Sequence, residues 1–311
     1  MKITTSLPRI IIPSCIGVMM CASALASGTA PEYYTDYPSK IENVTAQLRG
    51  YINEHPERTT DSMMNHVLDD INNGKIASVK TLASLRKKKL STEDLYDLCR
   101  KSTLVFGKME HVGYLGKDSA YSNASAVALT PDGICATNFH VISDIVICGA
   151  FDYKKQGDRS RFVMDCDGYA YPMLSVIAID PLNDLALIKV DTRDKKLTPA
   201  PLNTAAKQGT KVYCLSNPSG AYFHFTDGMV SNCTRTTDKR SGHTKYIMEV
   251  TSDYGVGASG GPIFDEHGNL VALVSSTLSL YANPQQFRNS RCHTSRLYLH
   301  SSSANVFPIK P

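Results

Sequence analysis

Residues 257–262 read Gly-Ala-Ser-Gly-Gly-Pro, a single serine set among three glycines and closed by a proline. Glycine loses backbone entropy in regular structure and proline removes a hydrogen-bond donor, so the stretch is unsuited to a helix or a central strand. It suits a tight loop that presents the Ser259 hydroxyl and turns backbone N–H groups toward one point. Acyl transfer needs this arrangement, because the nucleophile must lie beside donors that stabilise an oxyanion. Taken alone, the stretch is equally compatible with a Gly/Ser turn between two strands.

Two upstream segments supply candidates for the base and the acid that a serine nucleophile requires. His140 ends a β-type run, and histidine is suited to taking and returning a proton near neutral pH. Asp184 directly precedes the apolar run Leu-Ala-Leu-Ile, which predicts a carboxylate at the edge of a core, able to accept from an imidazole N–H. Each residue alone also fits an ordinary structural role, as a core histidine or a strand-entry cap. Together they occur in the order His140, Asp184, Ser259, which is the order of the chymotrypsin triad.

Around these residues the chain has the pattern of two all-β units in tandem. From residue 102 onward, short β-type runs are separated by turn signals such as residues 131–133 (Pro-Asp-Gly), without a helical period between them. This spacing predicts barrels or a sandwich rather than βαβ units. The first series of predicted strands comprises residues 104–109, 124–129, 134–137, 144–150, 162–164, 174–179 and 186–190. The second series comprises residues 211–215, 228–233, 246–251, 262–264 and 270–275.

The preceding residues, 27–101, are predicted to form a helical region without a pattern of catalytic residues. Apolar residues at spacings of three and four, together with capping signals, predict four helices. These helices cover residues 39–52, 63–73 and 76–90, and a fourth begins at Ser91 with Asp94 close to a capping box. The apolar stripes are best explained as the region's own core. The basic run at residues 86–89 fits a solvated helix face, and a processing site is the alternative.

The amino terminus has the features of a secretory signal peptide. Lys2 and Arg9 are followed by a mostly apolar run at residues 10–25, and residues 24–26 (Ala-Leu-Ala) form an A-x-A site with cleavage before Ser27. The run is short for a membrane span, although an uncleaved anchor is the alternative, and no later segment is long enough to cross a bilayer. The sequence therefore predicts a secreted or periplasmic protein without membrane association after cleavage.

Composition narrows the function classes further. A net charge of +4 over 311 residues gives no reason to propose nucleic acid as a partner. Of the nine cysteines, seven follow the predicted cleavage site, so at least one is not paired within the chain. None lies in a CxxC arrangement, and neither a metal nor a cofactor is predicted. Cys214 and Cys233 lie on two predicted strands and are candidates for a disulfide, with buried free thiols as the alternative.

The three motifs together resemble the trypsin-like serine endopeptidases, and within them the HtrA/Deg type, over residues 103–276. The matching segments are T-N-x-H-V at 137–141, D-P-L-x-D-L-A-L-x-K at 180–189, G-x-S-G-G-P at 257–262 and an N-P-x-G turn at 217–220. The resemblance implies a mainly β fold, a double six-stranded β-barrel of trypsin-like type preceded by a small helical region. It also implies an active site between the barrels, with His140 and Asp184 from the first barrel and Ser259 from the second.

The resemblance extends to the residues around the triad. It implies an oxyanion hole formed by the backbone N–H groups of Gly257 and Ser259. It further implies substrate binding by strand addition at residues 271–276, so that Val274 and Ser275 are candidate substrate-binding residues. Asp253 lies six residues before Ser259 and is a candidate for the base of a specificity pocket. The alternative is that Asp253 belongs to a simple turn and that the substrate preference is for small aliphatic residues.

Two departures from the family pattern limit what is carried over. Ala258 precedes the nucleophile where trypsin-type enzymes carry aspartate, so it has no carboxylate to pair with a freed amino terminus. Only 35 residues follow Ser276, which leads us to expect no PDZ domain.

The sequence thus predicts a signal peptide at 1–26, a helical region at 27–101, a protease domain at 102–285 and a tail at 286–311. The predicted function is an extracytoplasmic serine endopeptidase that acts on extended or unfolded polypeptides through an acyl-enzyme. One alternative is a latent or weakly catalytic module that binds polypeptides in a chaperone-like way and is regulated by the helical region. Another is a precursor in which residues 27–100 form a prosegment. An oligomer is compatible with the sequence.

Overall fold

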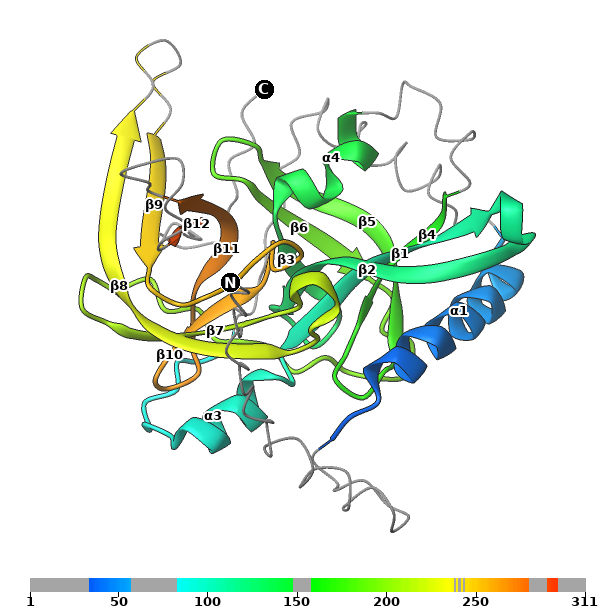
Figure 1. Ribbon diagram of the computed structural model, residues 1–311, viewed down its shortest axis with the longest axis horizontal. Helices are drawn as coiled ribbons and strands as arrows, with labels where there is room; N and C mark the ends of the chain where they lie inside the picture. Colours follow the sequence, from blue (N-terminus) through cyan, green and yellow to red (C-terminus); the bar gives the residue numbers. More distant parts are fainter. Residues whose placement is uncertain are drawn as a thin grey trace, which may run out of the picture. The chain divides into compact units, whose positions relative to one another are not determined.

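Two closed barrels of antiparallel strands form the framework of the protein (Figure 1). The computed structural model describes residues 34–56, 83–147, 158–237, 239, 242, 244–279 and 290–295. Every element below belongs to one compact unit, Tyr37–Pro311. The predicted signal peptide and the predicted helix at 63–73 lie outside the described residues.

The first barrel has the strand order β1-β2-β3-β6-β5-β4 and closes through the pairing of β1 with β4. Its elements are β1 (Thr103–Val112), η2 (Gly113–Leu115), β2 (Lys117–Ala128), β3 (Ile134–Thr137), α4 (Phe139–Ile147), β4 (Asp158–Met164), β5 (Ala170–Asp180) and β6 (Leu185–Val190). Alternate side chains of these strands fill the barrel, because successive residues of a strand point to opposite faces. Fully buried members of this core include Leu104, Phe106 and Ile188.

The second barrel has the order β10-β11-β12-β9-β8-β7. Its elements are β7 (Lys211–Ser216), η5 (Pro218–Gly220), β8 (His224–Thr237), β9 (Thr244–Val250), β10 (Pro262–Asp265), β11 (Leu270–Ser279) and β12 (Ser290–Ser295). The prediction of a mainly β fold with two six-stranded barrels is confirmed. β12 falls within residues 286–311, for which the sequence predicts a tail, and it pairs with both β11 and β9.

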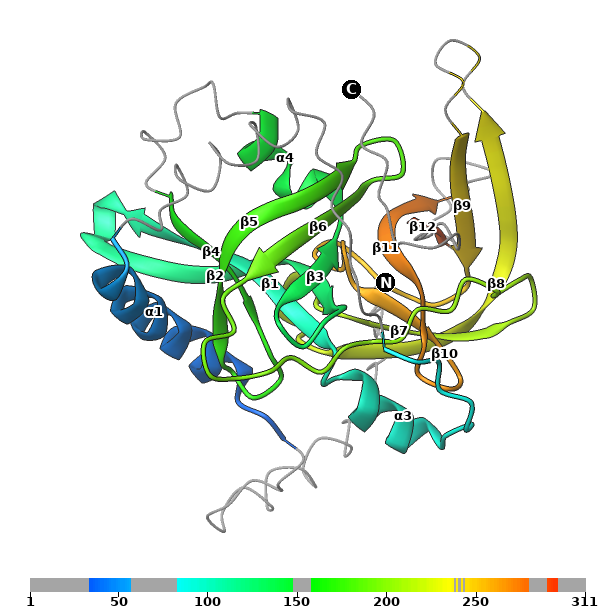
Figure 2. The same cartoon turned by 180° about the vertical axis from the view of Figure 1, so that it is seen from behind.

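Two helices precede the barrels and pack onto them (Figure 2). Helix α1 (Tyr37–Glu54) lies along the first barrel against β2 and β5, and it buries Val44, Leu48 and Tyr51 as the apolar spacing predicts. Helix α3 (Thr92–Cys99) begins after Ser91, whose side chain accepts a hydrogen bond from the Asp94 amide at 3.1 Å. The predicted cap of this helix is therefore confirmed.

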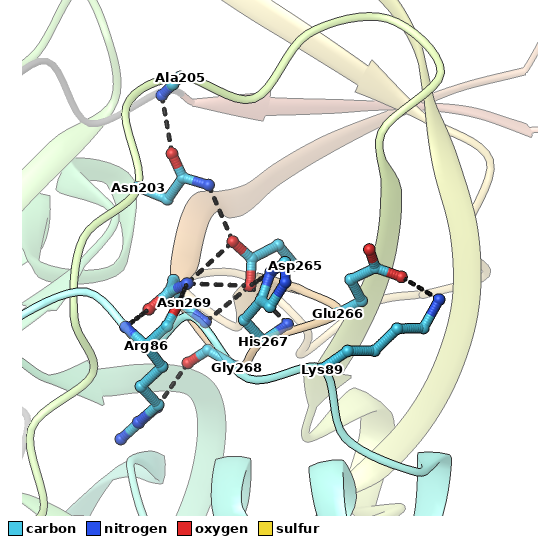
Figure 3. Close-up of polar contacts among 9 residues, drawn as sticks. All are labelled: Arg86, Lys89, Asn203, Ala205, Asp265, Glu266, His267, Gly268 and Asn269. Atoms are coloured by element: carbon cyan, nitrogen blue, oxygen red, sulfur yellow. Dashed lines mark hydrogen bonds and ion pairs between the residues drawn. The ribbon is translucent and has the colours of Figure 1, made fainter.

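Residues 83–90, which we call the basic strap, form neither a helix nor a strand, whereas the sequence predicts a helix there. Its backbone pairs with the β10–β11 hairpin: the Arg86 amide donates to Asn269 Oδ1 (2.8 Å), and Asn269 Nδ2 donates to the Arg86 carbonyl (3.0 Å). Lys89 forms an ion pair with Glu266 at 2.6 Å. Figure 3 shows both basic side chains directed at this hairpin. Backbone groups satisfied by another segment leave no i→i−4 ladder, so the helix prediction is wrong for these residues.

The hairpin that receives the basic strap is held by the buried carboxylate of Asp265. This carboxylate accepts hydrogen bonds from Asn203 Nδ2 (2.8 Å) and from the amides of His267 (2.9 Å) and Asn269 (2.9 Å). A carboxylate that closes a turn in this way fixes the position of the following asparagine. The surface that Arg86 contacts is therefore held by hydrogen bonds that do not involve the strap.

The strand predicted at residues 144–150 is wrong for residues 144–147, which are the ones that the structure describes. Residues 144–147 belong to helix α4, which begins at Phe139 and buries Ile142 and Ile145 three residues apart on one face. A short apolar run does not distinguish a buried strand from a buried helix turn.

The predicted disulfide between Cys214 and Cys233 is also wrong, because neither cysteine is in a disulfide. Cys214 on β7 lies opposite Thr226 on β8, seven residues before Cys233. Seven strand residues span about 20 Å, whereas a disulfide requires Cα atoms within about 7 Å. Cys99, Cys135 and Cys166 are likewise free and buried.

Candidate active site

The side chains of His140, Asp184 and Ser259 meet in one hydrogen-bonded chain. His140 is the second residue of α4, Asp184 ends the turn before β6, and Ser259 lies in the loop before β10. His140 Nδ1 is 2.8 Å from Asp184 Oδ2, and His140 Nε2 is 2.9 Å from Ser259 Oγ. His140 and Asp184 thus come from the first barrel and Ser259 from the second. This geometry allows a proton to pass from the serine to the imidazole.

The carboxylate of Asp184 is held from three directions. Besides the imidazole, it accepts the His140 backbone N–H at 2.9 Å and the Ser275 hydroxyl at 2.5 Å. Asn138 Nδ2 donates to the Asp184 carbonyl at 2.9 Å, which fixes a backbone φ of +53° that aspartate tolerates better than most residues. The sequence predicts Ser275 as a substrate-binding residue, but the structure places its hydroxyl on Asp184. No local sequence signal identifies this contact, because it depends on the packing of β11 against the first barrel.

Helix α4 carries His140 and is anchored to the barrel wall. Arg161 on β4 donates to Asp144 Oδ2 at 2.7 Å, and the arginine side chain is only 2% exposed. An ion pair with one buried partner is sensitive to geometry, so it holds the helix in one orientation. Together with the buried Ile142 and Ile145, it fixes the turn of helix from which the imidazole projects.

Glycines are required at two positions of the serine loop. Gly260 has φ +78°, and a Cβ there would lie 2.2 Å from the Ser125 carbonyl oxygen. Gly257 has φ +91°, and a Cβ there would lie 2.8 Å from the Ser219 amide nitrogen. The Ser125 amide also donates to the Ser259 carbonyl at 2.7 Å, which ties the loop to β2. Only a residue without Cβ lets the loop approach both barrels this closely.

Two backbone donors lie beside the serine. Residues 255–258 form a type II turn, in which the Ala258 amide donates to the Gly255 carbonyl at 3.0 Å and Gly257 has positive φ at the third position. Within the described part of the chain, neither the Gly257 amide nor the Ser259 amide donates a hydrogen bond. Unpaired amides next to a serine hydroxyl are the donors that an oxyanion requires.

This fold and this geometry agree with a comparison against protein families. The model of the trypsin-like peptidase domain matches residues 124–273, which contain all three side chains of the hydrogen-bonded chain. The chain contains a trypsin-like peptidase domain.

Curated relatives of this peptidase domain are of the Do, DegP and HtrA type. Protease Do-like 5, chloroplastic, from Arabidopsis thaliana is 27% identical over 151 residues, which is 47% of this chain and 46% of the relative. A probable periplasmic serine endoprotease DegP-like from Brucella suis is 27% identical over 166 residues, 53% of this chain and 29% of the relative. The chain thus spans less than half the length of either relative.

A solved structure is similar as well. The crystal structure of Deg5 is 23% identical, covers 60% of this chain and 87% of that chain, and has a TM-score of 0.47.

Asp253 and Val274 are the other two residues that the sequence predicts to bind substrate. Asp253 has an exposed side chain, and its carbonyl accepts from Thr226 Oγ1 at 2.7 Å. Val274 is 2% exposed, and its amide and carbonyl pair with Gly261 (2.8 Å) and Gly260 (2.9 Å). Neither backbone group of Val274 is left for a substrate strand, which corrects the sequence prediction. These two hydrogen bonds hold the serine loop against β11.

Electrostatics in the peptidase domain keep Asp184 ionised. Burial by itself raises the pKa of this carboxyl, but the hydrogen bonds from His140 and Ser275 and the nearby imidazole outweigh it. The net result is a pKa below the ordinary aspartate value. A carboxylate that stays charged can accept from the imidazole and stabilise an imidazolium.

The lowered pKa of Asp184 predicts a pH-dependent contribution to stability. A carboxyl whose pKa is depressed on folding stabilises the native state above its unfolded pKa, near 4, and loses that contribution as pH falls through the folded value. We expect the difference in Tm between wild type and Asp184→Asn to be constant from pH 7 to about pH 5. It should shrink steadily below about pH 4. Thermal unfolding followed by circular dichroism measures it, and a difference that grows on acidification would contradict the prediction.

Proposed function

We propose that this protein is a serine endopeptidase that hydrolyses peptide bonds in extended or unfolded polypeptides. The observation that carries the proposal is the hydrogen-bonded chain from Ser259 through His140 to Asp184, beside two unpaired amides. Curated relatives named as serine proteases support the reaction class.

In the proposed reaction, Ser259 Oγ attacks the scissile carbonyl while His140 Nε2 takes its proton. The carbonyl oxygen becomes an oxyanion that accepts from the Gly257 and Ser259 amides. His140 then donates the proton to the leaving amine, and the C–N bond breaks to leave an ester on Ser259. Water, deprotonated by the same imidazole, hydrolyses this acyl-enzyme and restores the serine. Asp184 holds the imidazole in the required tautomer throughout.

The proposed preference for extended substrates rests on an open strand edge. β10 pairs with β11 only as far as Leu273, and beyond that β11 pairs with β12 on its other side. From Ser275 onward, one edge of β11 therefore has no partner strand among the described residues. An extended polypeptide can add to such an edge through main-chain hydrogen bonds, which do not depend on its sequence.

We further propose a location outside the cytoplasm. The signal-like residues 1–26 support it, as does the Brucella relative, which is named as a probable periplasmic endoprotease; the Arabidopsis relative is named as chloroplastic. No helix in the described ranges is long and apolar enough to span a bilayer.

Removal of residues 27–100 as a prosegment is less well supported. Helix α1 buries Val44, Leu48 and Tyr51 completely or almost completely, and the Tyr51 hydroxyl donates to Asp191 at 2.8 Å. Losing the helix would expose this apolar surface on the barrel, at a cost of about 1.5–3 kcal/mol for each large side chain. We therefore assign α1 to the mature protein.

Labelling with a fluorophosphonate probe tests the proposal. The purified protein is expected to react, with the adduct located on Ser259 by mass spectrometry, because only an activated serine attacks the probe at neutral pH. Ser259→Ala, which lacks the reacting hydroxyl, is the negative control. A folded wild-type protein that does not react would overturn the proposal for a constitutive enzyme. Reaction that appears only after limited proteolysis near Lys89 would identify a latent enzyme instead.

A further inference from the structure

The direction of an oxyanion donor is determined by the carbonyl at the other end of its peptide bond. In a planar trans peptide, the N–H and the C=O point in opposite directions. The Gly257 donor belongs to the Val256–Gly257 peptide, and the Ser259 donor belongs to the Ala258–Ser259 peptide. Holding either carbonyl therefore aims the corresponding N–H.

The two carbonyls are held in different ways. The Ala258 carbonyl accepts a backbone hydrogen bond from the Gly261 amide at 2.8 Å. The Val256 carbonyl accepts a side-chain hydrogen bond, from Ser219 Oγ at 3.0 Å. Within the described residues, no other group donates to this carbonyl, and the Val256 residue is 87% exposed. One side-chain hydroxyl thus controls the orientation of the Val256–Gly257 peptide.

The turn that carries Ser219 is rigid enough to act as an anchor. Ser219 lies in η5, directly after β7, with φ +45° and ψ +39°, a conformation that few residues other than glycine adopt. The preceding Asn217 is buried and fixes the turn, since its Nδ2 donates to the Leu104 carbonyl at 3.1 Å and its Oδ1 accepts from the Phe223 amide at 2.9 Å. The turn also contacts the serine loop directly, as the close approach of Gly257 to Ser219 shows.

The competing arrangement of the loop is a type I turn. Types I and II differ mainly by a reversal of the central peptide, which here is the Val256–Gly257 peptide. In the reversed state, the Val256 carbonyl would face the oxyanion position and the Gly257 N–H would face away. Gly257 permits the type II turn by its positive φ, but Val256 and Gly257 also tolerate a type I turn, so the sequence of the loop does not exclude the reversed state. The hydrogen bond from Ser219 favours the type II turn.

We propose that Ser219 is a positioning residue for catalysis, whose hydroxyl holds the Val256–Gly257 peptide with its N–H toward the oxyanion. The proposal rests on the peptidase function proposed above. It assigns to the third residue of the Asn-Pro-Ser-Gly turn a role in transition-state stabilisation without contact to substrate.

Two substitutions distinguish the effect of the Ser219 hydroxyl from the effect of the backbone conformation at this residue. Ser219→Ala removes the hydroxyl, and Ser219→Gly removes it while fitting the positive φ better than serine does. We expect both variants to lower kcat on fluorescently labelled unfolded casein by about 10- to 100-fold with little change in KM, compared with about 10²- to 10³-fold for loss of a whole oxyanion donor. The rate of fluorophosphonate labelling should fall by a similar factor, because the phosphoryl oxygen occupies the same position.

The outcomes distinguish this proposal from the proposed function. Wild-type kcat in Ser219→Gly, with a loss confined to Ser219→Ala, would mean that backbone conformation alone matters and would overturn the proposal. A parallel rise in KM, or a Tm lowered enough to unfold the variants, would also overturn it, since a positioning role leaves substrate binding and folding intact. A wild-type protein that neither reacts with the probe nor cleaves casein overturns the proposed function and this inference with it.

Discussion

Replacing His140 by alanine is expected to lower kcat by about 10⁶-fold while changing KM little. The imidazole is the group that contacts Ser259 Oγ, at 2.9 Å, and it is the group that returns the proton to the leaving amine. Without it, the serine hydroxyl stays protonated and the amine leaves as an unprotonated anion. Initial rates on labelled casein, at substrate concentrations above and below KM, measure both parameters.

His111 provides a matched control for this substitution. It also pairs with an aspartate, since its Nδ1 is 2.9 Å from Asp118 Oδ1, but it lies on the β1–β2 hairpin. His111→Ala should therefore retain wild-type kcat. Activity of His140→Ala within 100-fold of wild type would exclude this histidine as the base.

Asparagine at position 184 is expected to lower kcat by about 10⁴-fold. The amide oxygen can still accept from the His140 backbone N–H, but the amide nitrogen would face His140 Nδ1. His140 Nδ1 then accepts a hydrogen bond from the amide, and the ring proton moves to His140 Nε2. In this tautomer Nε2 can no longer take a proton from Ser259. The variant should remain folded at neutral pH, and steady-state kinetics together with thermal unfolding measure the two effects separately.

The neighbouring Asp180 is the control within the same turn. Its carboxylate accepts from the Asn183 amide at 3.0 Å and from Asn183 Nδ2 at 2.7 Å, so it shapes the turn without contacting the imidazole. Asp180→Asn should lower kcat far less than Asp184→Asn does. Equal losses in the two variants would assign the effect to the turn and not to the tautomer of His140.

Much of the fold and of the candidate site is predictable from the sequence because each part has a local cause. Glycines lie on both sides of Ser259 where the backbone needs positive φ, and short β-type runs mark every strand of the two barrels except β12. The hydroxyl contacts of Ser219 and Ser275 are different. They depend on which strand lies beside which loop, and a serine in a polar turn or at a strand end gives no sign of its partner.

The wrong predictions have physical causes of the same kind. The basic strap has helical spacing, but its backbone finds better partners in the β10–β11 hairpin than in its own preceding turn. Residues 144–147 join a helix because the chain already turns at Phe139, before the apolar run begins. In the basic strap a tertiary contact overrides the local preference, whereas residues 144–147 continue a helix that has already begun.

If the protein is the peptidase proposed above, the division of His140, Asp184 and Ser259 between two barrels determines when it can first act during its own synthesis. His140 and Ser259 are 119 residues apart in the chain, and Ser275, which completes the setting of Asp184, comes later still. At roughly 5–20 residues per second, the ribosome needs about 6–24 s to pass from the base to the nucleophile. Throughout that interval the first barrel carries a histidine and an aspartate with no serine to activate. The nascent chain is therefore unable to digest itself, or the unfolded chains around it, until its second half has emerged.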